Sequence, residues 1–351
     1  MTPRVTAVER RLPTHVATQD ELLAAFRGLW AGEHFNLERL EDLHRAVGVA
    51  RRHLALPLSE YPALKTFGAR NDAWIAAATD LGEVTVRGVL AKAGLQPQHL
   101  DALFFVTVTG VATPSVDARL MNRLQLRRDL KRTPIFGLGC VAGAAGLARA
   151  SDYLRAFPAH RALLLSVELC SLTLQREDVS IANIISSGLF GDGAAAVLLE
   201  GAEVAGPGPR VLATRSVFYR NTERIMGWDV VDGGFKVVLS AKVPDLVREH
   251  ICQNVDEFLG AHGLNRRAIS HWVAHTGGPK VLTAFEEALD LPEQALRRSR
   301  ASLQEVGNLS SASVLHVLGD LLDSGEAQEG DLGLVMAMGP GFCGELVLLR
   351  W

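Results

Sequence analysis

The sequence predicts an α/β protein in which helices cover a buried sheet, and two observations support this class. Short apolar runs that end at small residues recur along the chain, and each leads into a segment with helical periodicity. Apolar residues make up 48% and charged residues 21% of the 351 residues, which is typical of a packed globular protein. We therefore expect strands and helices to alternate, in one large unit or in two domains.

The first half of the chain begins this alternation with LFFVTVTG at residues 103–110, which we predict to be a buried strand. A second strand is predicted over 133–139. It leads into a helix over 141–157, whose first turns contain only small side chains and can be packed on all sides. Strands at 162–168 and 194–200 complete this half.

The second half repeats that order. HWVAHTGG from His271 corresponds to LFFVTVTG, helices start at Lys280 and Ser310, and LGLVMAMG and ELVLLRW form two closing strands. Matching elements in matching order predict a duplicated αβ unit, with halves at 1–207 and 208–351. The GPGP run at 206–209 interrupts the pattern and marks the boundary between them.

Composition also bounds the partners and the location of the protein. A formal net charge of -3 gives no general attraction to nucleic acid or to an anionic membrane. The N-terminal segment has no apolar core typical of a signal sequence, and no run approaches about 20 apolar residues. The four cysteines form no CxxC pair. We expect a cytoplasmic protein with free thiols, no metal, no nucleic-acid partner and no stable membrane association.

Cys140 is the candidate nucleophile. It stands in FGLGCVAGAAG, where a strand turns into a helix, and a helix start supplies partial positive charge and free N–H groups. Both favour the thiolate, which is the species that attacks a thioester. The alternative is a buried structural cysteine, but the glycine-rich turn favours a reactive thiol.

His275 and Asn308 are the candidate partners of Cys140. His275 ends a strand before a Gly-Gly-Pro turn, so we expect its imidazole at the sheet edge where ligands bind; His271 and His316 lack this position. Asn308 precedes a helix, where capping is the alternative role. Because Cys140 and Asn308 precede corresponding helices, a pseudo-twofold would bring them together. An imidazole and an amide, with no carboxylate nearby, suit stabilisation of an enolate formed by decarboxylation.

Five motifs in the same order resemble the type III polyketide synthases, the chalcone synthase relatives within the thiolase fold. They are GCVAG around Cys140, GLFGDGAA around Phe190, WVAHTGGP around His275, GNLSSAS around Asn308 and GPGF near Gly341. The resemblance spans nearly the whole chain. It implies a thiolase-like fold, in which the duplicated αβαβα unit forms a five-layered core. It also implies a symmetric homodimer that uses free coenzyme A thioesters, with no cofactor and no carrier protein.

The resemblance further implies a role for each matching residue. Cys140 would carry the acyl group, while His275 and Asn308 would stabilise the enolate left when malonyl-CoA loses carbon dioxide. The enolate would attack the Cys140 thioester in repeated rounds, followed by cyclisation. Phe190 is implied as a gate between the coenzyme A tunnel and the cavity. The residues implied to line the cavity are Thr109, Cys170, Thr173, Val237 and Ser310.

The sequence departs from the plant members of that family at the cavity. Val237 stands where they have a second gating phenylalanine, and Cys170 stands where they have a threonine, so we expect a roomier pocket. The segment GWDVVDGGFKVVLS resembles microbial members that use fatty acyl starters, which indicates an alkylpyrone or alkylresorcinol product. The basic residues expected at the coenzyme A site, or alternatively as solvated surface charges, are Arg51, Arg52 and Lys280.

Two other functions stay open on the sequence alone. A ketoacyl synthase of the fatty-acid initiation kind shares the fold and the Cys-His-Asn set, but it takes a carrier-protein thioester and usually condenses once. Thr276 stands where those enzymes normally have glutamine, which argues against this function. A catalytically silent thiolase-fold partner subunit is the second alternative, although it would have no need of a reactive thiol at a helix start.

Overall fold

The computed structural model describes residues 2–30, 37–292 and 294–351, and it confirms the α/β class. Its main feature is a nine-stranded mixed sheet with strand order β11-β12-β13-β8-β1-β7-β6-β4-β5. The strands of the first half are β1 (Arg4–Arg11), β4 (Ala102–Thr107), β5 (Lys131–Phe136), β6 (Arg161–Leu169) and β7 (Asp192–Glu200). Those of the second half are β8 (Arg210–Phe218), β11 (His271–Ala274), β12 (Leu332–Gly339) and β13 (Cys343–Arg350).

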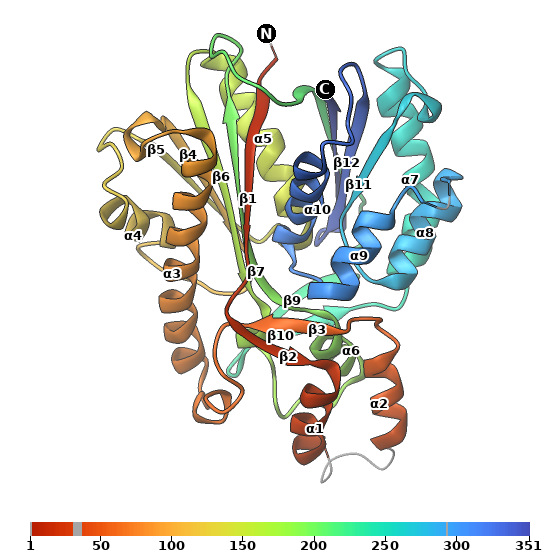
Figure 1. The fold of residues 1–351 in the computed structure, drawn as a ribbon. Coiled ribbons are helices and arrows are strands. Elements are labelled where there is room, and N and C mark those ends of the chain that lie inside the picture. Colours follow the sequence, from red (N-terminus) through yellow and green to blue (C-terminus); the bar gives the residue numbers. More distant parts are fainter. Residues whose placement is uncertain (1, 31–36, 293) are drawn as a thin grey trace.

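The helices divide the molecule into five layers (Figure 1). The two halves of the sheet meet where Arg4 of β1 pairs with Arg210 of β8, and they diverge from there. Two helices fill the space between them, α5 (Ala142–Ala156) and α10 (Ser311–Ser324). The outer faces are covered by α3 (Phe67–Ala93) on one side and by α7 (Val243–Gly260) and α8 (Pro279–Leu289) on the other. This is the five-layered core that the family resemblance implied.

The small residues at the start of α5 explain how the two central helices fit between the two halves of the sheet. A Cβ atom on Gly143 would lie 2.2 Å from the carbonyl oxygen of Ser311 in α10, so the backbones are in contact there. Residues 142–148 are all buried, as the sequence predicted for this helix start. Every residue of β4 and β7 is buried as well, because helices cover both faces of these strands.

The smaller elements lie mostly at one end of the sheet, where they close the candidate site (Figure 1). The elements at this end are β2 (His15–Thr18), β3 (Arg51–Leu54), β9 (Met226–Val231), β10 (Gly234–Leu239), α1 (Gln19–Trp30), α2 (Leu37–Arg45) and α6 (Ile181–Leu189). The remaining α-helices are α4 (Val116–Arg123) and α9 (Arg297–Val306). The predicted boundary falls in the loop between β7 and β8, and the division at 207/208 stays a prediction. None of the helices described is long and apolar enough to cross a bilayer.

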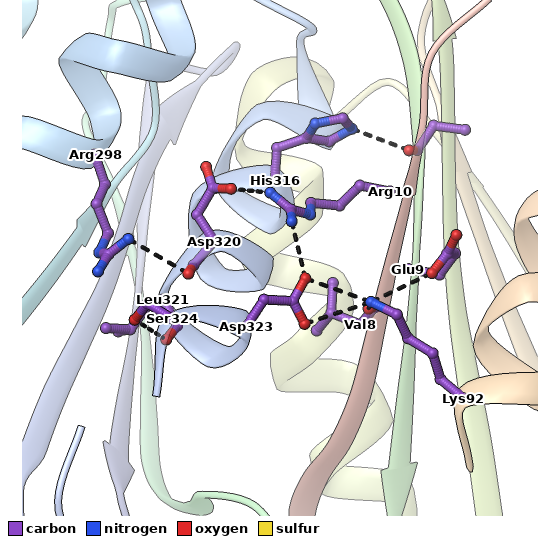
Figure 2. A network of polar contacts seen from close by, with 11 residues as sticks. Val8, Glu9, Arg10, Lys92, Arg298, His316, Asp320, Leu321, Asp323 and Ser324 are labelled. Atoms are coloured by element: carbon purple, nitrogen blue, oxygen red, sulfur yellow. Dashed lines mark hydrogen bonds and ion pairs between the residues drawn. The ribbon is translucent and has the colours of Figure 1, made fainter. Parts of the chain in front are cut away.

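A polar cluster ties α10 to the first half of the chain (Figure 2). Arg10 of β1 donates to Asp320 and, at 2.8 Å, to Asp323, both on α10. Lys92 of α3 lies 3.4 Å from Asp323 and 3.3 Å from Glu9 of β1. Strand β1, helix α3 and helix α10 therefore share one set of charges, which links the C-terminal part of α10 to the first half of the chain.

The burial of His316, next to this cluster, predicts that the free energy of unfolding depends on pH. Its Nε2 donates to the Ala194 carbonyl at 3.0 Å, and burial lowers its pKa to about 4. As the pH falls, His316 is protonated in the unfolded chain near its ordinary pKa of 6.5, but in the folded protein only near pH 4. Its contribution to the free energy of unfolding is therefore fully present above pH 6.5 and is lost as the pH falls towards 4. At pH 5 the loss amounts to about 2 kcal/mol.

We predict that His316→Gln, which keeps an amide donor and cannot titrate, reduces the fall in unfolding free energy between pH 7.5 and 5 by this amount. Urea unfolding at both pH values checks it, and an unchanged fall would contradict the assignment.

Candidate active site

Cys140 lies in a short 3-10 turn, Gly139–Val141, between β5 and α5. A Cβ on Gly139 would lie 2.7 Å from the ring of Pro340, and its φ of 56° favours glycine, so this turn requires glycine before the cysteine. The thiol is buried, and its Sγ lies 3.8 Å from the hydroxyl oxygen of Ser310, directly before α10. The starts of α5 and α10 therefore meet, as the predicted pseudo-symmetry requires.

Asn308 is paired with Phe190 through the backbone. The two residues form an isolated parallel bridge, in which Asn308 N donates to the Leu189 carbonyl at 2.8 Å and Gly191 N donates to the Asn308 carbonyl at 3.0 Å. The side-chain Oδ1 of Asn308 accepts from Ser310 N at 2.8 Å, which is a local bond in the turn before α10. The N-cap position of α10 is Ser310, so Asn308 does not cap this helix. In the described part of the chain its Nδ2 has no protein partner, so this donor is available to a ligand.

His275 follows β11 and is buried, with 4% of its surface exposed. Neither ring nitrogen has a hydrogen-bond partner among the described residues. Buried polar atoms are normally paired, so two unpaired ring nitrogens point to a role towards a ligand. Burial lowers the pKa of His275 to about 4, because the cation would have neither water nor a partner. The imidazole is therefore neutral in the free protein and can accept a proton.

Three adjacent spaces surround these residues, and Phe190 lines all of them. We call them the histidine, thiol and apolar chambers. The histidine chamber, about 470 Å³, is lined by His275, Asn308 and Phe190. The thiol chamber, about 40 Å³, is lined by Cys140 and Ser310. The apolar chamber has a volume of about 250 Å³. Phe190 thus borders the chamber of the imidazole, the chamber of the thiol and the apolar chamber, which is a position suited to a gate.

The other predicted cavity residues divide between these chambers. Cys170 and Val237 line both the thiol and apolar chambers, Thr173 lines the apolar chamber, and Thr109 and Ser310 line the thiol chamber. The hydroxyl of Thr109 is already engaged, since it accepts from Trp74 Nε1 at 3.1 Å and donates to a carboxylate at 2.9 Å. Thr109 therefore contributes shape to the chamber more than a free polar group.

That carboxylate is Glu168, which the sequence analysis did not identify as a site residue. Its Oε2 accepts from Thr109 Oγ1 and, at 3.0 Å, from Val108 N, while its Oε1 accepts from Ser311. Burial raises the pKa of Glu168, although these donors act in the opposite direction. A carboxylate that the sequence analysis did not anticipate thus lies close enough to Cys140 to influence its thiol, although it lines none of the three chambers. The available signal was one charged residue inside the apolar run ALLLSVEL.

The predicted lowering of the thiol pKa is also wrong for the free protein. Burial raises the pKa of Cys140 to about 12, and the charge of Glu168 adds to this, while Ser310 lowers it. Loss of water around the sulfur thus outweighs the helix-start effect. The thiol and the His275 imidazole are both neutral before substrate binds, so a thiolate has to form by transfer of the thiol proton to a base.

The three basic residues predicted for coenzyme A lie in different surroundings. Lys280 is exposed and lines the histidine chamber, where a phosphate could reach it. Arg51 is exposed on β3. Arg52 is 1% exposed, and its guanidinium donates to backbone carbonyls of Ser187 and Gly188. The expectation that Arg52 lies at a basic mouth is therefore wrong, because its donors are already used inside the protein.

Comparison with known proteins assigns the family. Residues 2–203 match the family described as Chalcone and stilbene synthases, N-terminal domain, and residues 211–351 match the corresponding C-terminal domain. The chain is 48% identical over 350 residues to 1,3,6,8-tetrahydroxynaphthalene synthase of Streptomyces peucetius subsp. caesius, covering 99% of this chain and 93% of that one. It is 36% identical over 358 residues to a putative chalcone synthase of Bacillus subtilis, covering 99% and 98%.

A solved structure agrees with these matches. The crystal structure of 1,3,6,8-tetrahydroxynaphthalene synthase from Streptomyces coelicolor A3(2), described as a bacterial type III polyketide synthase, superposes with a TM-score of 0.94 at 32% identity and 99% coverage of both chains. The chain belongs to the chalcone and stilbene synthase family. It is a type III polyketide synthase of thiolase-like fold, an acyltransferase that condenses acyl-CoA with malonyl-CoA by decarboxylation and without a carrier protein. This assignment replaces the two alternatives that the sequence left open.

Proposed function

We propose that Cys140 carries the growing chain. In the loading step the thiol proton moves to His275, and the sulfur attacks the carbonyl carbon of an acyl-CoA thioester. The coenzyme A thiolate leaves and takes the proton back from the imidazolium. Burial keeps both groups neutral before substrate binds, so we expect the thiolate and the imidazolium to form only as the sulfur attacks, as a pair without net charge.

Decarboxylation takes place in the histidine chamber, which Phe190 also lines. Malonyl-CoA bound in the histidine chamber loses carbon dioxide, and the electron pair of the broken C–C bond passes to an enolate. The enolate oxygen accepts hydrogen bonds from His275 and from Asn308 Nδ2. The enolate carbon then attacks the Cys140 thioester and expels the thiolate for the next round. The observation that carries the proposal is that His275, whose ring nitrogens are both unpaired among the described residues, lines one chamber together with Asn308 and Phe190.

We propose an alkylpyrone or alkylresorcinol as the product, because a suitable space for an alkyl chain adjoins the thiol chamber. The apolar chamber begins at Cys170 and Val237 and extends between α1 and β3. The apolar side chains of its wall include Leu22, Phe26, Leu54, Leu58 and Leu174. Burial of each CH₂ group of a starter there would contribute about 0.8 kcal/mol.

The names of the relatives favour a second candidate. Several are named for tetrahydroxynaphthalene, and one from Pseudomonas fluorescens is named phloroglucinol synthase at 32% identity over 341 residues. Neither compound contains an alkyl chain. A product of this kind would leave the apolar chamber without a starter chain.

One experiment separates these products. The purified protein is incubated with malonyl-CoA alone and with malonyl-CoA plus acyl-CoAs of increasing length, and the products are identified by mass. We expect products that retain the acyl chain, and we expect Val237→Phe to reduce the use of long acyl-CoAs by about 10-fold by narrowing the junction of the two chambers. Val230→Phe, on the exposed part of β9, is the matched control. Aromatic products from malonyl-CoA alone, unchanged by long acyl-CoAs, would support the second candidate and refute the first.

We also propose a symmetric homodimer. Strand β5 forms one edge of the sheet, most of its residues are exposed, and Phe136 at its end is 51% exposed. An exposed edge of this kind is suited to pairing with a second copy across a twofold axis. Light scattering should give the mass of a dimer, and Phe136→Glu should weaken it. The cytoplasmic location stays a prediction.

A further inference from the structure

Arg52 is buried in the wall of the apolar chamber, on the side of β3 that faces α6. Its guanidinium donates to the carbonyls of Ser187 and Gly188 and, at 3.3 Å, to the carbonyl of Phe190. It also donates to the side-chain oxygen of Gln19. The Arg52 side chain thus donates to the carbonyls of three of the four residues 187–190.

These carbonyls belong to the end of α6, whose last helical residue is Leu189. The last carbonyls of a helix have no partner inside the helix, and a positive charge is favourable there. Arg52 supplies both the donors and the charge. Burial lowers the pKa of Arg52 to about 10, which still leaves it charged at neutral pH, and the buried Asp192 carboxylate acts to raise it.

Residues 187–190 are joined to the proposed reaction centre by backbone hydrogen bonds. Leu189 and Gly191, on either side of Phe190, exchange backbone hydrogen bonds with Asn308 at 2.8 and 3.0 Å. The position of Asn308 therefore depends on the backbone that Arg52 holds. The Phe190 ring depends on it as well, because its own carbonyl is one of the acceptors.

Arg52 is itself held from the opposite side. Gln19, at the start of α1, accepts from the guanidinium and donates through Nε2 to the His44 carbonyl at 2.6 Å. The ring of His44 packs on Gly188, where a Cβ would lie 2.9 Å from the ring. All of these side chains are buried. The guanidinium therefore has one defined position between α1, α2 and α6.

We propose that Arg52 is a positioning residue for the condensation reaction, which sets the backbone of residues 187–190 so that Phe190 and Asn308 face the substrate. This inference rests on the proposed roles of those two residues. It predicts an effect on steps that use Asn308 and Phe190, with a smaller effect on the loading of Cys140.

The test compares Arg52→Lys with wild type in three measurements: acyl loading of Cys140 by intact mass, release of carbon dioxide from malonyl-CoA, and the distribution of product lengths. Lysine keeps the charge but cannot reach three carbonyls at once. We expect loading within about 3-fold of wild type, decarboxylation lowered by about 10-fold or more, and products shifted to fewer extensions. Arg155→Lys is the matched control, because Arg155 donates to the Val211 and Leu212 carbonyls at 2.9 Å away from the site. It should leave the ratio of decarboxylation to loading unchanged.

Gln19→Met is the second variant, which decides the question if Arg52→Lys does not fold. It removes the Gln19 acceptor of the Arg52 guanidinium and leaves the three bonds to carbonyls in place. The rate of decarboxylation relative to loading should therefore fall by about 3-fold. A ratio and product distribution equal to wild type in the folded variants would overturn the inference. Asn308→Leu, measured in parallel, distinguishes a failure of the proposed function from a failure of the Arg52 inference. If Asn308→Leu decarboxylates malonyl-CoA at the wild-type rate, the proposed function of Asn308 is wrong. If Asn308→Leu loses decarboxylation but the Arg52 and Gln19 variants do not, only the role of Arg52 is rejected.

Discussion

Cys140→Ala is expected to lose acyl loading and polyketide formation by at least about 10³-fold, the largest effect of any substitution considered. The structure places the Cys140 sulfur 3.8 Å from Ser310, in a chamber that shares Phe190 as a lining residue with the chamber of His275. No covalent intermediate can form without it. Loading is measured by intact mass after incubation with acyl-CoA, and products are measured with malonyl-CoA added. Cys252→Ala, in the middle of α7, is the matched control and should load normally. Product formation at the wild-type rate by Cys140→Ala would refute the assignment.

Cys140→Gln divides the reaction further. The substitution removes the nucleophile but leaves His275 and Asn308 in place, so malonyl-CoA should still lose carbon dioxide while no carbon–carbon bond forms. Release of carbon dioxide without product would show that decarboxylation and acyl transfer use different groups. Loss of both activities in a folded Cys140→Gln protein would show that the thiol takes part in decarboxylation as well.

Periodicity in the sequence was enough to predict most of the fold. The apolar runs before and after Cys140 and His275 become strands of one sheet, and the small residues after Cys140 become a helix that contacts Ser311 at backbone distance. These features depend on local pattern and on residue size, both of which a sequence shows directly. The repeat order then predicted the meeting of the two central helix starts.

The parts that sequence reasoning missed depend on burial and on long-range pairing. Arg52 and Arg51 are neighbours in one basic pair, but the alternation of a β-strand buries one and exposes the other. Glu168 lies inside an apolar strand, and its partners come from segments more than 50 residues away. The thiol pKa follows the loss of water around Cys140, which outweighs a helix-start effect that the sequence could show. Each property needs the three-dimensional arrangement.

Asn308→Leu is expected to lower the release of carbon dioxide from malonyl-CoA by about 10² to 10³-fold, the magnitude typical for loss of one donor to a developing oxyanion. The Nδ2 of Asn308 is the amide donor in the histidine chamber, and leucine has similar size without it. Loading of Cys140 should fall much less, because proton transfer from the thiol uses His275. Single-turnover release of carbon dioxide and intact mass measure the two steps separately.

Asn308→Asp tests whether this loss reflects the Nδ2 donor or the turn bond of Oδ1. Oδ1 of Asn308 accepts from Ser310 N at 2.8 Å, and Ser310 lies next to the Cys140 sulfur, so loss of this turn bond alone would also disturb the site in Asn308→Leu. An aspartate keeps the acceptor for Ser310 but replaces the Nδ2 donor with an oxygen that repels an enolate. If the amide donates to the enolate, Asn308→Asp should lose decarboxylation at least as completely as Asn308→Leu. If Asn308 acts only through its turn bond to Ser310, Asn308→Asp should decarboxylate at nearly the wild-type rate, and His275 would then be the enolate donor without help from position 308.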